Sequence, residues 1–485
     1  MTLKEREILL MSIDELANII KKNQITCYNL CKIFINQINK YENKINGMAY
    51  NCFEDALNIA MYYDLKYKKI KLKDKKLLSL PKYFGVPITV KASFELQGKP
   101  FTLGYTDRKN ILGKKLNPLC SRLIKHGMII IASTNIPEGS SWIESSNKLY
   151  GTTSNPYDLN RTAGGSSGGS AALVAICGSP ISLCSDALGS IRIPALYNGI
   201  FGHKTTGGCI NGWYCDSNDG EAESPDILNY YAQGGILCKY SKELWPITNL
   251  LMENNIYSKL VRKYDYSNLK LDQVTFIYIG ESFKNNMVGK LDYDIYNSIH
   301  NMLTTLKNKN INVEFKNYIE FEYTALIIIS EINNHFDTNG DISTKSIWSN
   351  FKELTLTEFS LSLTSKVLDN KNAENILSKM LSILKTKLKR EFQNNDNTVL
   401  IAPTMGIVAP YHNTSIKHIM NIIFTGIFNI LKLPVTQIPL GLNYKGLPLG
   451  CQIIGNKYQD KLTMKVAELL EEANISKWIP PKLIN

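Results

Sequence analysis

A block of glycines and serines runs directly into an apolar segment, and this junction constrains the fold more than any other feature. Residues 161–171 read RTAGGSSGGSA and are followed by ALVAICG. Glycine and serine alone are typical of flexible linkers, but an apolar run is usually buried. We therefore expect a fixed loop that leads into a buried helix. The preceding residues, NPYDLNRTA, are turn-rich and polar, so they lack the strand that a Gly-x-Ser-x-Gly nucleophile elbow requires.

Strand-like and helix-like segments alternate around this block. Residues 85–91, GVPITVK, alternate as in a half-buried strand that ends at Lys91. A helix near 120–126 and a strand at 127–133 follow. This interleaving predicts an α/β protein whose sheet is covered by helices on both faces.

The rest of the chain predicts a single domain of 485 residues. We divide it into N-terminal helices at 12–70, a catalytic core at 80–206, a variable region at 210–400 and a C-terminal sheet and helix at 400–475. The further expected elements are a helix opened by a capping box of Ser12 and Glu15, helices at 27–41 and 53–69, a long loop at 205–235, one strand at 271–280 among helices over 240–400, an exposed turn at 392–397, strands at 398–404 and 446–455, and a closing helix at 459–473.

A second serine motif lies downstream: SDALGSIRIPA, residues 185–195, places Ser190 directly after Gly189. A serine hydroxyl becomes an effective nucleophile when a neighbouring base takes its proton. Burial lowers the pKa of a lysine, so a buried Lys91 could be that base. Glycines also let backbone N–H groups approach a developing oxyanion. Two glycine-flanked serine motifs and this lysine therefore suggest nucleophilic acyl transfer without histidine.

Lys91, the GGSSGGS block and SDALGSIRIPA together resemble the amidase signature family. Residues 44–57, 130–206 and 424–455 look most similar to its fatty-acid amide hydrolase branch, particularly the second vertebrate type. The resemblance implies a mixed β-sheet sandwiched between layers of α-helices. It also implies hydrolysis of carboxylic amides with a hydrophobic acyl chain, a place in lipid metabolism, and no cofactor.

The resemblance implies a role for each motif residue. Ser190 would be the nucleophile that forms the acyl-enzyme. Ser166, on a cis peptide bond, would pass protons between Ser190 and Lys91, which would serve as general base and later as acid. The oxyanion hole would be formed by four consecutive backbone N–H groups, those of Ala187, Leu188, Gly189 and Ser190.

Three more residues are implied around this triad, and one position beside the nucleophile departs from the family. Ser140 falls where the family places a backbone contact to substrate. Asp186 and Arg192 would form an ion pair that supports the nucleophile loop, by which we mean the SDALGSIRIPA segment around Ser190. Leu188 stands where the family usually has a second glycine. A leucine still has an N–H to donate, but we expect it to narrow the oxyanion hole or to alter the backbone there.

Two alternative functions stay open. The first is that of a glutaminase resembling the A subunit of the tRNA-dependent amidotransferase, although that branch usually has glutamine where this chain has Ile193. The second is that of a catalytically silent binding protein with the same fold, which Leu188 motivates. Glutamine hydrolysis would support the first alternative, and failure to label with a serine-directed fluorophosphonate would support the second.

Composition narrows the partners. The net charge of +12 comes from dispersed lysines, so we expect no nucleic acid, and the six histidines show no metal-ligand spacing. No run approaches the ~20 apolar residues of a membrane span. Peripheral contact with an anionic membrane and a homodimer stay open. Ten cysteines and a charged N-terminal segment predict reduced thiols in the cytosol.

Overall fold

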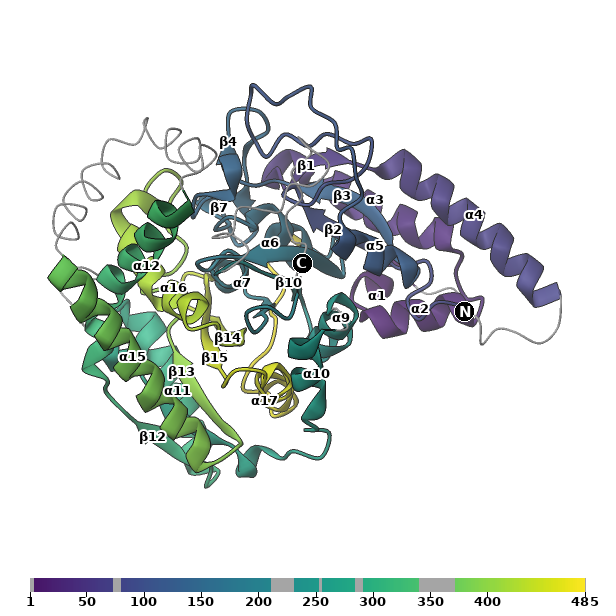
Figure 1. Cartoon of the computed structure of the whole chain (residues 1–485). Coiled ribbons are helices and arrows are strands. Elements are labelled where there is room, and N and C mark those ends of the chain that lie inside the picture. Colours follow the sequence, from purple (N-terminus) through teal and green to yellow (C-terminus); the bar gives the residue numbers. More distant parts are fainter. Residues whose placement is uncertain are drawn as a thin grey trace.

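Eleven strands form one mixed sheet through the middle of the computed structural model (Figure 1). The structure describes residues 4–72, 80–210, 231–252, 255–283, 291–339 and 371–484. Within these ranges the strands lie in the order β1-β3-β2-β8-β10-β9-β14-β15-β13-β11-β12. Their bounds are β1 Met48–Asn51, β2 Pro87–Lys91, β3 Ile129–Thr134, β8 Ile181–Asp186, β9 Phe201–Lys204, β10 Gln233–Cys238, β11 Thr275–Tyr278, β12 Val313–Phe315, β13 Thr398–Ala402, β14 Val435–Leu442 and β15 Pro448–Ile454.

The pairing confirms the predicted α/β class with a mixed sheet. Parallel pairs join β2 to β3 and β8, and β11 to β12 and β13. The middle of the sheet is antiparallel, because β9 pairs with both β10 and β14. Two short hairpins, β4 Ser146–Asn147 with β5 Gly151–Thr152 and β6 Ser154–Asn155 with β7 Asp158–Thr162, lie outside the main sheet.

Helices cover both faces of the sheet. Successive residues of a strand face opposite sides, and β10 shows where each side leads. A Cβ added at Gly234 would lie 3.0 Å from Leu119 in one layer, whereas a Cβ at Gly235 would lie 2.8 Å from Ile191 in the other. The helices are α1 Glu5–Leu9, α2 Ile13–Lys21, α3 Cys27–Ile45, α4 Phe53–Leu72, α5 Pro118–Lys125, α6 Gly168–Ala175, α7 Arg192–Tyr197, α9 Leu244–Leu251, α10 Ile256–Lys263, α11 Tyr293–Asn308, α12 Thr324–Asn339, α15 Lys371–Asn394, α16 Ile423–Ile430 and α17 Asp460–Glu472.

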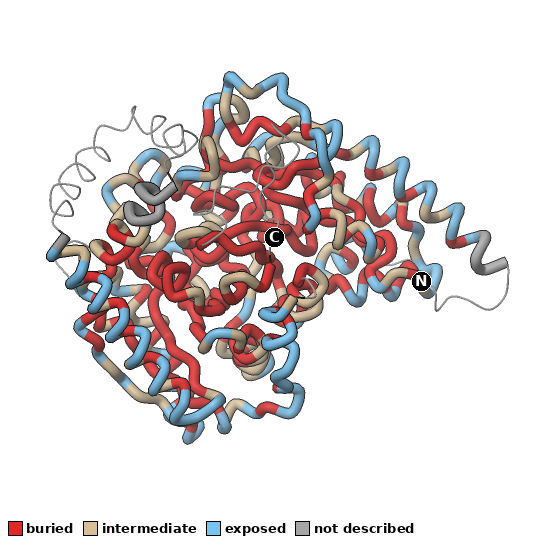
Figure 2. Tube along the Cα trace, viewed as in Figure 1, coloured by how far each residue is buried: buried red, intermediate tan, exposed pale blue. Residues whose placement is uncertain are grey.

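The predicted junction between the glycine–serine block and a buried helix is confirmed. The block leads into α6, all eight residues of which are buried. Figure 2 shows a buried interior that extends across the molecule, while outer helices such as α4 and α15 carry alternating buried and exposed residues. The predicted capping box is also present, since the Ser12 N–H donates to Glu15 at 2.7 Å and the Glu15 N–H donates to the Ser12 hydroxyl at 3.5 Å.

Two strands were wrongly assigned from the sequence. The loop expected at 205–235 ends in a strand, because β10 begins at Gln233; residues 211–230 of that loop lie outside the described ranges. The two glycines of β10 mimic loop composition, but they allow close packing against neighbouring elements. Residues 240–400 also contain β12 in addition to β11, so the expectation of one strand is wrong. β12 is short and incompletely buried, and therefore lacks an apolar signal.

None of the helices in the described ranges combines the length and the apolar character that crossing a bilayer requires.

Candidate active site

Lys91 is the buried base candidate at the end of β2. Its strand lies between β3 and β8, and only 1% of the residue is exposed. Burial removes water from the ammonium group and lowers the pKa of Lys91 to about 8, although Cys184 and Asp186 oppose this effect. A useful fraction of Lys91 is therefore neutral near physiological pH and can accept a proton.

Ser166 is the direct hydrogen-bond partner of this lysine. The Lys91 Nζ donates to the Ser166 Oγ at 2.7 Å, and both groups are buried. The peptide bond between Gly165 and Ser166 is cis. The structure thus brings together two of the three residues that the sequence places in the triad.

The glycines around Ser166 allow other backbone segments to approach closely. Gly164 has a φ of +83°, which favours glycine, and a Cβ at Gly165 would collide with the carbonyl oxygen of Trp142. The Ser145 hydroxyl holds the same turn from the side: it accepts from the Gly168 N–H at 2.8 Å and lies 3.2 Å from the Ser166 carbonyl oxygen. Ser166 is therefore fixed by its backbone as well as by Lys91.

Ser190 lies beyond the end of β8, next to this turn. It is half-buried, and its carbonyl oxygen accepts from the Ser167 N–H at 3.3 Å. This contact joins the two serine motifs, which are separate in sequence. The contact places Ser190 beside the turn that carries Ser166, and its partial exposure is compatible with attack on a substrate that enters from solvent.

Among the described residues, several N–H groups of the nucleophile loop have no acceptor, but that of Gly189 has one. The Gly189 N–H donates to the Asp186 carboxylate at 2.8 Å. Within the described residues, the N–H groups of Ala187, Leu188 and Ser190 have no acceptor. Gly189 itself has a φ of +129°, a conformation that side chains rarely tolerate, so glycine is required for the bend of the loop.

Asp186 and Arg192 form a fully buried ion pair beneath the loop, as the sequence predicts. The Arg192 Nε and Nη2 donate to the carboxylate at 3.0 and 2.9 Å, and the Ile191 N–H donates at 3.1 Å. Burial opposes the charged carboxylate, but the guanidinium holds the pKa of Asp186 well below its ordinary value. The lowered pKa favours the anionic form of Asp186, which accepts hydrogen bonds from the loop backbone and orders it.

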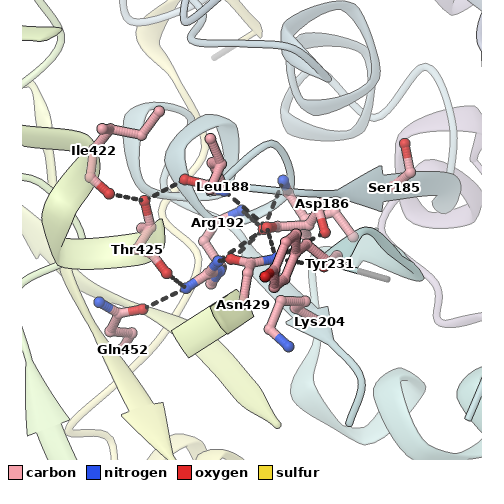
Figure 3. Close-up of polar contacts among 12 residues, drawn as sticks. Ser185, Asp186, Leu188, Arg192, Lys204, Tyr231, Ile422, Thr425, Asn429 and Gln452 are labelled. Carbon is pink, nitrogen blue, oxygen red and sulfur yellow. Dashed lines mark hydrogen bonds and ion pairs between the residues drawn. The ribbon is translucent and has the colours of Figure 1, made fainter. Parts of the chain in front are cut away.

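Three residues from the C-terminal half complete this support, and the sequence interpretation missed them (Figure 3). Arg192 donates to the Thr425 carbonyl oxygen at 3.0 Å and to the Gln452 side chain at 3.1 Å. The Asn429 amide donates to the Asp186 carbonyl oxygen at 3.0 Å. Nothing in their local sequence marks these residues, since only the pairing of β9 with β14 brings their segment to the loop.

Ser185 is a fourth residue that the sequence interpretation missed. The Lys91 Nζ lies 3.2 Å from the Ser185 Oγ and 3.4 Å from the Ser185 carbonyl oxygen. The available signal was its position in the same motif as Ser190, one residue before Asp186. Lys91 therefore meets hydroxyl groups from both serine motifs.

Ser140 lies in a short 3-10 turn, Glu138–Ser140, with a φ of +59°. Its N–H donates to the Pro137 carbonyl oxygen at 3.0 Å, and its buried hydroxyl oxygen has no partner in the described part of the chain. The structure records no hydrogen bond between Ser140 and Lys91, Ser166 or Ser190 in these ranges. Trp142, two residues after Ser140, lies close to the turn that carries Ser166, because a Cβ at Gly165 would collide with the Trp142 carbonyl oxygen.

No group of three or more His, Cys, Asp or Glu side chains in the described ranges is placed to hold a metal ion. The chemistry available at the site is that of hydroxyl groups, one lysine amine and backbone N–H groups.

Comparisons with known proteins identify the family of this chain. The profile of the amidase family matches residues 29–464. Human fatty-acid amide hydrolase 2 is 30% identical, with 98% of this chain and 91% of that protein covered. The A subunit of the glutamyl-tRNA(Gln) amidotransferase from Caldanaerobacter subterraneus subsp. tengcongensis is 25% identical, with 96% and 97% covered. A solved structure of fatty acid amide hydrolase shares the fold, with a TM-score of 0.77 at 20% identity and 97% and 86% covered. The chain belongs to the amidase signature family of amide-bond hydrolases.

Proposed function

We propose that this chain hydrolyses carboxylic amides with hydrophobic acyl groups through an acyl-enzyme on Ser190. The observation that carries the proposal is the 2.7 Å contact between the buried Lys91 amine and the Ser166 hydroxyl. The similarity to human fatty-acid amide hydrolase 2 over nearly the full length of both chains supports the hydrophobic acyl group.

In the proposed acylation step, the Ser190 Oγ attacks the amide carbonyl carbon. Ser166 takes the Ser190 proton and gives its own proton to neutral Lys91. The resulting ammonium group then returns a proton through Ser166 to the amide nitrogen. The carbon–nitrogen bond breaks, the amine leaves, and the acyl group stays on Ser190 until water releases it as a carboxylic acid by the same relay.

The developing oxyanion would be held by the free N–H groups of Ala187, Leu188 and Ser190. The Gly189 N–H donates to Asp186, so we assign Gly189 to the bend of the loop and not to a direct contact with the oxyanion. Ser140 would contact the substrate through its backbone, beside the turn that carries Ser166. Asp186 and Arg192 would act by keeping the loop in place.

The test is fluorophosphonate labelling of the pure protein with peptide mapping. We expect label on Ser190, no label in Ser190→Ala, and slower labelling in Lys91→Ala. Ser141→Ala is the matched control, because Ser141 is exposed and its hydroxyl bonds only locally, to the Gly139 carbonyl oxygen. Absence of label on the wild-type protein would favour the catalytically silent alternative.

Substrate assays separate the two enzymatic candidates. Release of fatty acids from fatty amides would support the proposal, whereas hydrolysis of glutamine alone would favour the glutaminase alternative. We place the enzyme in a reducing compartment, the cytosol, and the nine described cysteines support this because all are buried and none forms a disulfide. Contact with a membrane surface is tested by sedimentation with anionic vesicles, and a homodimer by light scattering.

A further inference from the structure

The side chain of Leu188 extends from the nucleophile loop and packs against α16. It is half-buried and belongs to the edge of an apolar cluster that includes Ile328 and Phe424. A Cβ added at Gly426 would lie 3.2 Å from the Leu188 Cδ2 and 2.9 Å from the Ile328 Cδ1. The missing side chain at Gly426 therefore makes room for both residues, and the leucine departs from the family pattern without a clash.

The backbone of Leu188 is held as firmly as its side chain. The Thr425 hydroxyl donates to the Leu188 carbonyl oxygen at 2.6 Å (Figure 3). Leu188 is also absent from the described residues that have a positive φ, so the leucine does not force a conformation that needs glycine. Two neighbouring residues of α16, Thr425 and Gly426, thus fix the main chain and accommodate the side chain of one loop residue.

The side chain of Leu188 packs in a different apolar cluster from the residue before Lys91. Ala187 packs against the apolar cluster that also contains Val90, the residue before Lys91, whereas Leu188 packs against the separate cluster at α16. In Figure 3, Ser185, which contacts Lys91, and Leu188 lie on opposite sides of Asp186. In the proposed reaction the leaving amine receives its proton on the side of Lys91 and Ser166, which leaves the side of Leu188 to the acyl group.

We infer that Leu188 is a specificity-determining residue that contacts the carbon next to the scissile carbonyl and selects against acyl groups branched there. This inference rests on the proposed function. The reason is steric: Leu188 is two residues from Ser190, its backbone is fixed, and Gly426 and Ile328 close the space behind it. A linear chain can pass such a side chain, but additional methyl groups on the carbon next to the carbonyl collide with it.

The apolar cluster beside Leu188 suits a linear hydrophobic chain beyond that carbon. Its partly buried members come from several elements around α12 and α16. They are Leu188, Leu291, Tyr323, Leu326, Ile329, Met380 and Met420. Contact with such side chains removes apolar surface of the acyl chain from water, which favours binding in proportion to the area covered.

The experiment compares kcat/KM for linear and branched N-acyl p-nitroanilides on the full-length protein. Butanoyl and octanoyl substrates are linear, and 2-methylpropanoyl and 2,2-dimethylpropanoyl substrates are branched. We expect Leu188→Ala to raise the ratio of branched to linear kcat/KM by about tenfold or more, the usual discrimination from one or two methyl groups. Gly426→Ala should lower this ratio, because the new methyl group leaves less room for Leu188.

Leu65→Ala is the control, because it makes the same change at an exposed leucine of α4 that belongs to neither apolar cluster. Its ratio should equal that of the wild type. Labelling of Ser190 is measured on every variant, so that a failure to fold is recognised and Gly426→Ala can decide the matter if Leu188→Ala does not fold. Unchanged ratios in variants that still label at Ser190 would overturn the inference alone. A wild-type protein that neither labels nor cleaves any substrate would overturn the proposed function, and this inference with it.

Discussion

Two buried lysines lie at the ends of strands of the main sheet, and their amines have different hydrogen-bond partners. Lys91 ends β2 and Lys204 ends β9, and burial lowers their pKa values to about 8 and about 7. The Lys91 amine meets hydroxyl groups of Ser166 and Ser185, whereas the Lys204 amine donates to the Thr205 carbonyl oxygen at 2.8 Å. A hydroxyl group can accept one proton and release another, but a carbonyl oxygen cannot. Burial favours the neutral form of both lysines, and in the proposed function the hydroxyl groups beside Lys91 add a route for its proton.

The largest expected effect contrasts the two lysines directly. Lys91→Met should lower kcat/KM for an amide by about 10²–10⁴-fold, because a general acid–base group contributes about that much. Lys204→Met should keep the wild-type order of magnitude, since the only hydrogen bond of the Lys204 amine within the described residues goes to a carbonyl oxygen. Steady-state kinetics on folded variants checks this. Equal losses in both variants would show that burial and not the hydroxyl partner is what matters.

The pH profile is the second test. Only neutral Lys91 accepts a proton, and its folded pKa is about 8, so kcat/KM should rise tenfold per pH unit below pH 8 and level off above it. The pKa of Lys204 in the wild type also lies near neutrality, at about 7, but we expect Lys204→Met to keep the same midpoint. Loss of the midpoint in Lys204→Met would mean that Lys204, and not Lys91, sets the pH profile.

A smaller effect is expected from Ser185→Ala. The Ser185 hydroxyl accepts from the ammonium form of Lys91 at 3.2 Å and stabilises it. Removing the hydroxyl should lower the pKa of Lys91 further, so the midpoint of the pH profile should move down by about one pH unit or less. The Ser166 contact remains, so catalysis persists. A midpoint that moves upward would mean that Ser185 holds the neutral form instead.

The last test concerns stability and not catalysis. The pKa of Lys204 is about 7 in the folded chain, against about 10.4 for an unfolded lysine. Between these values the unfolded chain binds more protons, so the wild-type free energy of unfolding should rise with pH. Lys204→Met lacks this contribution. The difference in Tm between Lys204→Met and the wild type should therefore shift in favour of the wild type from pH 7 to pH 10, which calorimetry measures; a constant difference would contradict the lowered pKa.

The sequence allowed prediction of what is local and left out what the fold assembles. The strand ending at Lys91, the buried helix after the serine block and the Asp186–Arg192 pair all depend on short motifs, and the structure confirms them. β10 was missed because its glycines serve packing in a strand but resemble a loop in composition.

The supports of the nucleophile loop could not be predicted in the same way. Thr425 and Asn429 are more than 230 residues from the loop they hold, and ordinary helix residues surround them in sequence. Their role comes from the pairing of β9 with β14, which no local pattern specifies. The role of Gly426 could not be predicted either, because a glycine is needed there to make room for the Leu188 side chain, which comes from the distant loop.

The position of α16 also has a consequence for synthesis. The contact between Arg192 and the Thr425 carbonyl oxygen spans 233 residues, and β9 acquires its neighbour β14 only from the C-terminal half. A growing chain on the ribosome carries Lys91, Ser166 and Ser190 long before it carries the residues that order the nucleophile loop. We therefore expect amide hydrolysis only after the polypeptide has been synthesised through β15, so an unfinished chain should not hydrolyse amides.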